Sequence, residues 1–289
     1  MHSADLSSNR AQRNCVTSTI GKLVLHIVYS NSVVAIATGV LCASFTYTLQ
    51  IETWLYYGFF AFFATFTVYN GQRLIKSAQP TETPWLVWVK RNEKLLLFGI
   101  VLAILGTLGS LIFIAKISFA AAAWLGISGI ISFFYVVRVK GVNMREIAYL
   151  KIHLIAFSWV TVLILFPALN EGLFSESLVW ITLAHYLYII AVTIPFDIRD
   201  LKFDKGSQMT IPQVVGQGWA KVSSIGLLLI FTGLMIWQIP ELQYNWMFYL
   251  AVAVQALLAL FMNEQKGDIY CAGGIDGAIT LLGISYFLI

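Results

Sequence analysis

Residues 95–115 read LLLFGIVLAILGTLGSLIFIA, a run of 21 residues without a charged side chain. A helix that crosses the hydrocarbon core of a bilayer needs about 20 consecutive, mostly apolar residues. Because this run has that length and no charge, we predict a transmembrane helix here. Similar stretches recur along the rest of the chain, and together they decide the fold.

The overall composition points the same way. The chain is 59% hydrophobic and only 11% charged, whereas a soluble domain carries about 25% charged residues. So little charge cannot cover the surface of a water-soluble fold of this size. We therefore expect an all-α polytopic membrane protein, most of whose surface faces lipid.

About nine stretches satisfy the length criterion for a membrane-spanning helix. They lie near residues 22–44, 53–75, 95–115, 117–137, 147–168, 178–196, 219–239, 244–262 and 271–289. The sixth ends at Pro195, where we expect a helix break or kink. The nine helices are expected to form one bundle around a central chamber.

The chain divides into two parts of very different length. Residues 1–21 are polar and are predicted to form a short cytoplasmic tail, while residues 22–289 form a single transmembrane domain. The apolar run after Lys22 is too long for the core of a cleavable signal peptide. The three cysteines have no spacing typical of a metal site or a disulfide framework.

The distribution of Lys and Arg predicts an orientation. With the N-terminus in the cytoplasm, 17 of the 18 basic residues fall in segments on the cytoplasmic side, and only Lys116 falls outside. This agrees with the positive-inside rule. We therefore predict a multi-pass protein of the cell (inner) membrane with a cytoplasmic N-terminus and the C-terminus on the other side.

Three carboxylates follow the sixth stretch: Asp197, Asp200 and Asp204. On a helix, Asp200 lies about −60° and Asp204 about −20° from Asp197, so all three share one face. Like charges repel unless a cation joins them, and Mg²⁺ prefers carboxylate oxygens together with substrate phosphates. The pattern indicates a magnesium–diphosphate site at the membrane edge. The alternative is a solvated loop in which nearby Lys and Arg neutralise the acids.

The Asp-x-x-Asp-x-x-x-Asp pattern of residues 197–204, followed by Gly206, Thr210 and Pro212, resembles the second Asp-rich motif of the UbiA superfamily of intramembrane prenyltransferases. Residues 134–140 and 145–152 are similar to that family's loop between its fourth and fifth spans. The length and the nine-helix layout match along nearly the whole chain.

The resemblance implies a transferase that moves a prenyl group, an alkyl group other than methyl, from an isoprenyl diphosphate to a lipid-soluble, typically aromatic acceptor. It implies Mg²⁺ as cofactor and membrane lipids as surroundings, with no role for nucleic acid. By position, Asp197, Asp200 and Asp204 would be metal ligands and catalytic residues. The implied contacts to the diphosphate are Tyr135, Arg138, Lys140 and Arg145.

The first motif of the family, NDxxDxxxD, is altered in this chain. Asn70 is kept, but the aspartate positions hold Gly71, Leu74 and Ala78. Arg73 lies about −60° from Asn70 on the same helix face, and an arginine fork suits phosphate oxygens. We therefore include Asn70 and Arg73, with Lys76 nearby, among the candidate diphosphate contacts. The alternative is that the two basic residues only follow the positive-inside rule.

Two other functions stay open at this point. The loss of the first motif is compatible with a catalytically altered or inactive UbiA-like protein that binds isoprenoid lipids. A secondary transporter would use the Asp cluster, or Asp276 in the last stretch, as its coupling site. The gathering of charge at one membrane face argues against the transporter, since transporter sites lie near the bilayer midplane.

Overall fold

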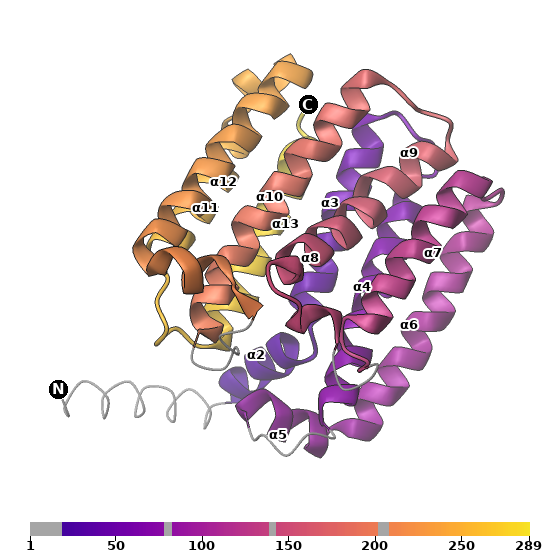
Figure 1. Ribbon diagram of the computed structural model, residues 1–289. Coiled ribbons are helices and arrows are strands. Elements are labelled where there is room, and N and C mark those ends of the chain that lie inside the picture. Colours follow the sequence, from indigo (N-terminus) through magenta and orange to yellow (C-terminus); the bar gives the residue numbers. More distant parts are fainter. Residues whose placement is uncertain (1–18, 78–82, 139–142, 202–207) are drawn as a thin grey trace.

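The chain folds into a bundle of helices, as the computed structural model shows for residues 19–77, 83–138, 143–201 and 208–289 (Figure 1). The regular structure of these residues is entirely helical. The longest helices are α4 (Trp54–Ser77), α6 (Glu93–Ile114), α10 (Glu176–Asp200) and α11 (Ile211–Gln238). The shorter α-helices are α2 (Thr19–Tyr29), α3 (Ser32–Thr48), α5 (Pro84–Arg91), α7 (Phe119–Phe134), α8 (Leu150–Val160), α9 (Phe166–Asn170), α12 (Trp246–Leu260) and α13 (Asp276–Tyr286).

Each of the nine predicted stretches coincides with helix, but fewer helices have the length and apolarity of a membrane span. Within the described residues, five satisfy both criteria: Glu93–Ile114, Leu150–Asn170, Glu176–Asp200, Ile211–Gln238 and Ile269–Tyr286. The bent pair Gly21–Tyr29 and Ser32–Thr48 makes a sixth if it is one span. The structure therefore supports a helical membrane protein with five or six such helices among the described residues, and the number of nine spans stays a prediction.

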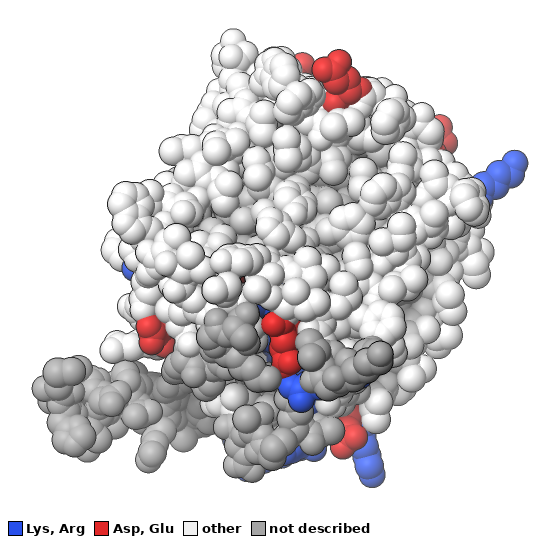
Figure 2. Space-filling model, in the orientation of Figure 1, with Lys and Arg blue, Asp and Glu red and all other residues white. Residues whose placement is uncertain are grey.

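The surface of the bundle fits lipid better than water. Only 17% of the apolar window of α6 is buried, and Leu95, Phe98 and Leu105 are each about 60% exposed. Exposed apolar surface on this scale is unusual for a monomeric soluble protein. Figure 2 shows a broad band of uncharged side chains across the visible face, with charged side chains mostly near its ends.

The first predicted span is broken between α2 and α3, which meet at an angle of 62°. Asn31 at the break has a left-handed backbone, with φ of 54°. Its side-chain amide donates to Oδ1 of Asn70 in α4 at 3.0 Å, and Nδ2 of Asn70 donates to the Ser30 carbonyl at 2.9 Å. Because both asparagines are buried, these bonds satisfy polar groups that the break removes from the helix ladder.

Helices α3 and α4 approach closely through two glycines. A Cβ atom at Gly58 would lie 2.6 Å from the Cβ of Ala43, and one at Gly39 would lie 2.9 Å from the Cβ of Phe62. Both distances are too short for a real side chain, so this crossing depends on glycine. Small residues play this role widely in membrane helix packing.

The break expected at Pro195 is absent, because α10 continues from Glu176 to Asp200. A proline has no N–H and leaves the carbonyl four residues earlier, here that of Ala191, without its helix bond. Ser224 of α11 replaces the missing donor, with its Oγ 2.7 Å from the Ala191 oxygen. The predicted break is therefore not found, the alternative of a kink stays a prediction, and the missing donor is replaced from a neighbouring helix.

Candidate functional site

The candidate site lies at one end of the bundle, where α4 and α10 end and α8 begins. Acidic and basic side chains gather at the corresponding end of the face in Figure 2. The two halves of the site come from segments far apart in the sequence, Arg73 and Lys76 from α4 and Asp197 and Asp200 from α10. The bundle thus brings together the two regions that the sequence singled out.

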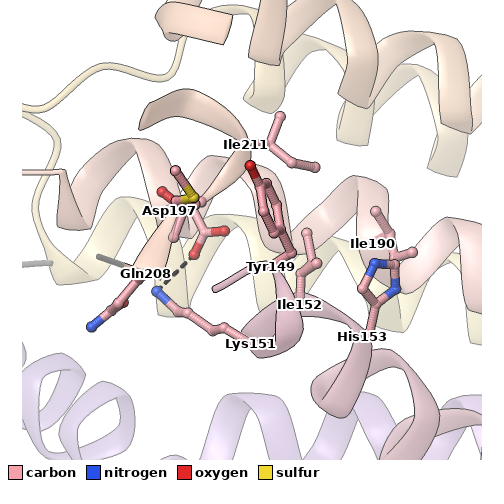
Figure 3. Close-up of a pocket in the computed structure, with 10 residues that line it drawn as sticks. Tyr149, Lys151, Ile152, His153, Ile190, Asp197, Gln208 and Ile211 are labelled. Atoms are coloured by element: carbon pink, nitrogen blue, oxygen red, sulfur yellow. Dashed lines mark ion pairs between the residues drawn. The ribbon is translucent and has the colours of Figure 1, made fainter. Parts of the chain in front are cut away.

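A buried ion pair joins α8 to α10 within this site. Nζ of Lys151 lies 2.8 Å from Oδ1 of Asp197 (Figure 3). The side chains are only 7% and 1% exposed. At such burial each charge depends on the other, because an unpaired charge in an apolar interior is very costly.

A cavity of about 80 Å³ adjoins this pair. It is lined by Tyr149, Lys151, Ile152, His153, Ile190, Asp197, Gln208, Met209, Thr210 and Ile211, and Figure 3 draws these residues. Within the described part of the chain, the buried Oε1 of Gln208 has no hydrogen-bond partner. Since a water molecule needs about 10–15 Å³ of such volume, the cavity is large enough to hold water.

Arg199 holds the second carboxylate of the Asp motif. Its Nε and Nη2 lie 2.8 Å and 3.2 Å from the two oxygens of Asp200, and its Nη1 lies 3.2 Å from Oδ1 of Asp268. The guanidinium also lies 5.3 Å from the ring centre of Phe196. Arg199 therefore links the end of α10 to the segment before α13.

Four basic side chains from three segments approach one another at this end. Lys76 of α4 lies within electrostatic range of Arg73, Arg145 and Lys151. We refer to these four residues as the basic group. Arg145 comes from the short helix η1 (Met144–Glu146), and both it and Lys151 also act on Asp200. The structure therefore places positive charge from α4, η1 and α8 beside the Asp motif.

The two residues predicted from the altered first motif, Asn70 and Arg73, form hydrogen bonds to the chain at the break between α2 and α3. Asn70 is fully buried and bonds to Asn31, Ser30 and Phe66. Nη1 of Arg73 donates to the Tyr29 carbonyl. Both side chains thus bond to the last residues before α3. The guanidinium of Arg73 also lies near Arg199, Asp268 and Asp276, so it belongs to the charged end as well.

The guanidinium of Arg73 is also packed against an aromatic ring, since it lies 5.1 Å from the ring centre of Trp85 in α5. Such cation–π contacts stabilise a charge without neutralising it. Arg73 is therefore held in place while it keeps its positive charge.

The loop residues predicted as diphosphate contacts divide into two sets. The guanidinium of Arg145, a member of the basic group, lies 5.7 Å from the ring centre of Tyr135. Arg138 is 47% exposed in its side chain and pairs with Glu146 at 2.8 Å. Lys140 and Asp204 lie outside the described residues. The structure thus brings Arg145 and Tyr135 into contact, and their role as diphosphate contacts stays a prediction.

The predicted magnesium site stays a prediction, and the described residues show only how two of its three aspartates are held. Asp197 is paired with Lys151 and Asp200 with Arg199. Among the described residues, no three or more His, Cys, Asp and Glu side chains are grouped so that they could hold a metal ion. Asp204, the third predicted ligand, lies outside the described residues.

The structure also brings in residues that were not among the predicted site residues, namely Lys151, Gln208 and Asp268. Lys151 carries a recognisable signal, because a lysine in the first turn of an apolar helix needs a buried partner or a path to water. Gln208 and Asp268 lie in short connections with no pattern that distinguishes them. Comparisons with protein-family models, with curated proteins and with solved structures find no match to this chain.

Proposed function

We propose that this protein binds the diphosphate of an isoprenyl diphosphate at the charged end of its bundle and transfers the prenyl group to a lipid-soluble, aromatic acceptor. The resemblance to the UbiA superfamily suggests the reaction. The observation that carries the proposal is that α4, η1 and α8 bring the basic side chains Arg73, Arg145 and Lys151 to the end of α10 that carries the Asp motif. Basic side chains gathered from separate segments favour an anion with several negative charges.

The arrangement suits a diphosphate for two further reasons. Lysine and arginine differ in how they bind phosphate, since lysine supplies a point charge and arginine a planar fork of donors, and the basic group contains two of each. Their three segments belong to one helical bundle, so the charges are positioned before a ligand arrives. Such preorganisation favours the stabilisation of charge on a leaving group.

In the proposed reaction, the bond between the allylic carbon and the diphosphate oxygen breaks, and its electron pair leaves with the diphosphate. The allylic carbon forms a bond to the acceptor, which loses a proton. The basic group stabilises the negative charge of the diphosphate. The apolar helices exclude water, which would otherwise capture the carbocation. Mg²⁺ stays a prediction, because Asp197 and Asp200 are paired with basic residues and Asp204 is outside the described residues.

The decisive experiment measures both binding and release of diphosphate. Purified protein is incubated with isoprenyl diphosphates of several chain lengths and a lipid extract, with and without Mg²⁺. Removing one charged hydrogen bond costs about 1.5–3 kcal/mol, so Lys76→Gln is expected to weaken diphosphate binding by about tenfold or more. Lys116→Gln removes one exposed lysine from the loop between α6 and α7 and is the matched control. Equal affinity of the two variants would refute the proposed site.

One observation favours a second function, that of a non-catalytic protein that binds isoprenoid lipids. Asn70 and Arg73 bond to the α2–α3 break, and Asp197 and Asp200 are held by basic side chains. These polar and charged side chains already have hydrogen-bond or ion-pair partners and do not need a substrate to supply them. Binding of isoprenyl diphosphates without diphosphate release, for every donor and acceptor offered, would support this second function against the first.

A further inference from the structure

A second concentration of basic side chains lies at the corner between α5 and α6. A hollow of about 380 Å³ is lined there by Lys90, Arg91, Asn92, Glu93, Lys94 and Leu95. Lys90, Arg91 and Lys94 are exposed, and Glu93 is the one acid in this lining. The corner therefore carries net positive charge around a space that a small anionic group can enter.

The backbone at this corner adds to its positive character. Asn92 is the N-cap residue of α6, but its side-chain amide donates back to the Trp88 carbonyl at 2.8 Å and makes no cap hydrogen bond. The first N–H groups of a helix carry a partial positive charge and bind anions readily. The beginning of α6 thus adds backbone donors to the three basic side chains.

The hollow continues directly into an apolar surface. From Leu95 onward, α6 exposes Phe98, Leu102 and Leu105. On the other side of the corner, α5 packs against α2 through Trp88, whose ring lies 5.4 Å from that of His26 and 6.1 Å from that of Tyr29. A basic hollow thus lies at the end of a helix whose apolar side chains face lipid, next to a short helix that is fixed to the bundle.

We propose that this corner binds the headgroup of an anionic phospholipid, with the acyl chains of that lipid lying along α6. The charges select against a zwitterionic headgroup, because its own amine would be repelled by Lys90, Arg91 and Lys94. The apolar surface of α6 favours a lipid over free phosphate, which would gain nothing from Phe98 and Leu102. None of these residues belongs to the basic group, so the proposal does not depend on the proposed enzymatic function.

The test uses the full chain in detergent and counts bound lipids by native mass spectrometry during titration with phosphatidylglycerol or phosphatidylcholine. The parent protein is expected to prefer phosphatidylglycerol. Each basic residue near an anionic lipid surface contributes about fivefold in affinity. The triple variant Lys90→Gln, Arg91→Gln, Lys94→Gln is therefore expected to weaken phosphatidylglycerol binding by at least tenfold and to leave phosphatidylcholine binding unchanged.

The control variant Lys116→Gln, Lys221→Gln, Lys266→Gln removes the same charge from other parts of the chain. It is expected to bind phosphatidylglycerol within threefold of the parent. The three side chains of the corner are exposed, so circular dichroism and gel filtration should show both variants folded. The proposal is overturned if the two triple variants behave alike, if phosphatidylcholine binds as tightly, or if millimolar inorganic phosphate displaces the lipid completely.

Discussion

Nζ of Lys151 and Oδ1 of Asp197 lie 2.8 Å apart and almost fully out of contact with solvent. The pair joins the beginning of α8 to the end of α10 at the candidate site. A buried ion pair adds little net stability, but removal of one partner leaves a buried charge uncompensated. This asymmetry leads to the first prediction.

Lys151→Met is expected to lower the free energy of unfolding by up to about 3–5 kcal/mol, because Asp197 would lose its ion pair with Lys151. The double variant Lys151→Met, Asp197→Leu removes both charges and should recover most of that loss. Thermal unfolding of the detergent-solubilised protein measures both effects. If the single and double variants unfold at the same temperature, the pair is not coupled as described.

Ser224→Ala removes the hydroxyl that donates to the Ala191 carbonyl beneath Pro195. We expect a loss of about 1–3 kcal/mol, the cost of leaving a buried acceptor unsatisfied. In a Pro195→Ala background the helix regains its own donor at residue 195, so the same Ser224→Ala change should cost much less. A double-mutant cycle on unfolding free energies checks this, and equal costs in both backgrounds would contradict the assignment.

Asn70→Ala removes the bonds that hold the α2–α3 break, and it is expected to destabilise the fold by about 1–3 kcal/mol. Gln72→Ala, two residues away, loses a single bond to the Ser132 carbonyl and serves as the control. Accelerated proteolysis near residues 29–32 would report the loosened break. A variant as resistant as the control would show that Asn70 does not support it.

Arg73 has a structural contact with Tyr29 and a place in the basic group, and the two roles are separable. If it contacts diphosphate directly, Arg73→Ala should weaken diphosphate binding by about tenfold or more, the effect expected for one charged hydrogen bond. Arg73→Lys keeps the charge and should recover part of the affinity. Isothermal titration of folded variants measures this, and unchanged affinity in Arg73→Ala would refute direct contact.

Removal of divalent metal separates the contribution of the basic group from that of Mg²⁺. Because positive charge already surrounds the site, we expect diphosphate binding to change by no more than about fivefold in excess EDTA, or about 1 kcal/mol. Diphosphate release should depend more strongly on added Mg²⁺ if the Asp motif binds the metal. Loss of binding by tenfold or more in EDTA would show that metal, and not the basic group, holds the ligand.

The helical class and the approximate places of the helices could be predicted from sequence, because they depend on apolar runs that are local. The uninterrupted course of α10 could not be predicted, because the donor that compensates for Pro195 is Ser224, which lies 29 positions later in the chain. The same holds for the break after Tyr29, where the supporting amide comes from Asn70. Hydrogen bonds supplied by a neighbouring helix cannot be predicted from a local stretch of 20 residues.

The candidate site could also be predicted only in part, because side-chain partners from other helices do not follow from spacing along one helix. Helical spacing places Asp197 and Asp200 on one face, and both residues do lie at the charged end. Spacing along α10 does not reveal that Lys151 pairs with one carboxylate and Arg199 with the other. On a helix, residue 199 projects away from the face shared by Asp197 and Asp200, but the long side chain of Arg199 still reaches the adjacent Asp200.

The helices at the perimeter of the bundle differ in length, and this has a consequence for the surrounding bilayer. At 1.5 Å per residue, the 22 residues of α6 extend about 33 Å, whereas the 16 of α7 extend about 24 Å. A hydrocarbon layer about 30 Å thick matches neither length. If α7 crosses the bilayer as α6 does, lipids stretch or thin from one side of the protein to the other, or α6 tilts. This uneven boundary should make the protein sensitive to acyl chain length, with shorter lipids preferred beside α7.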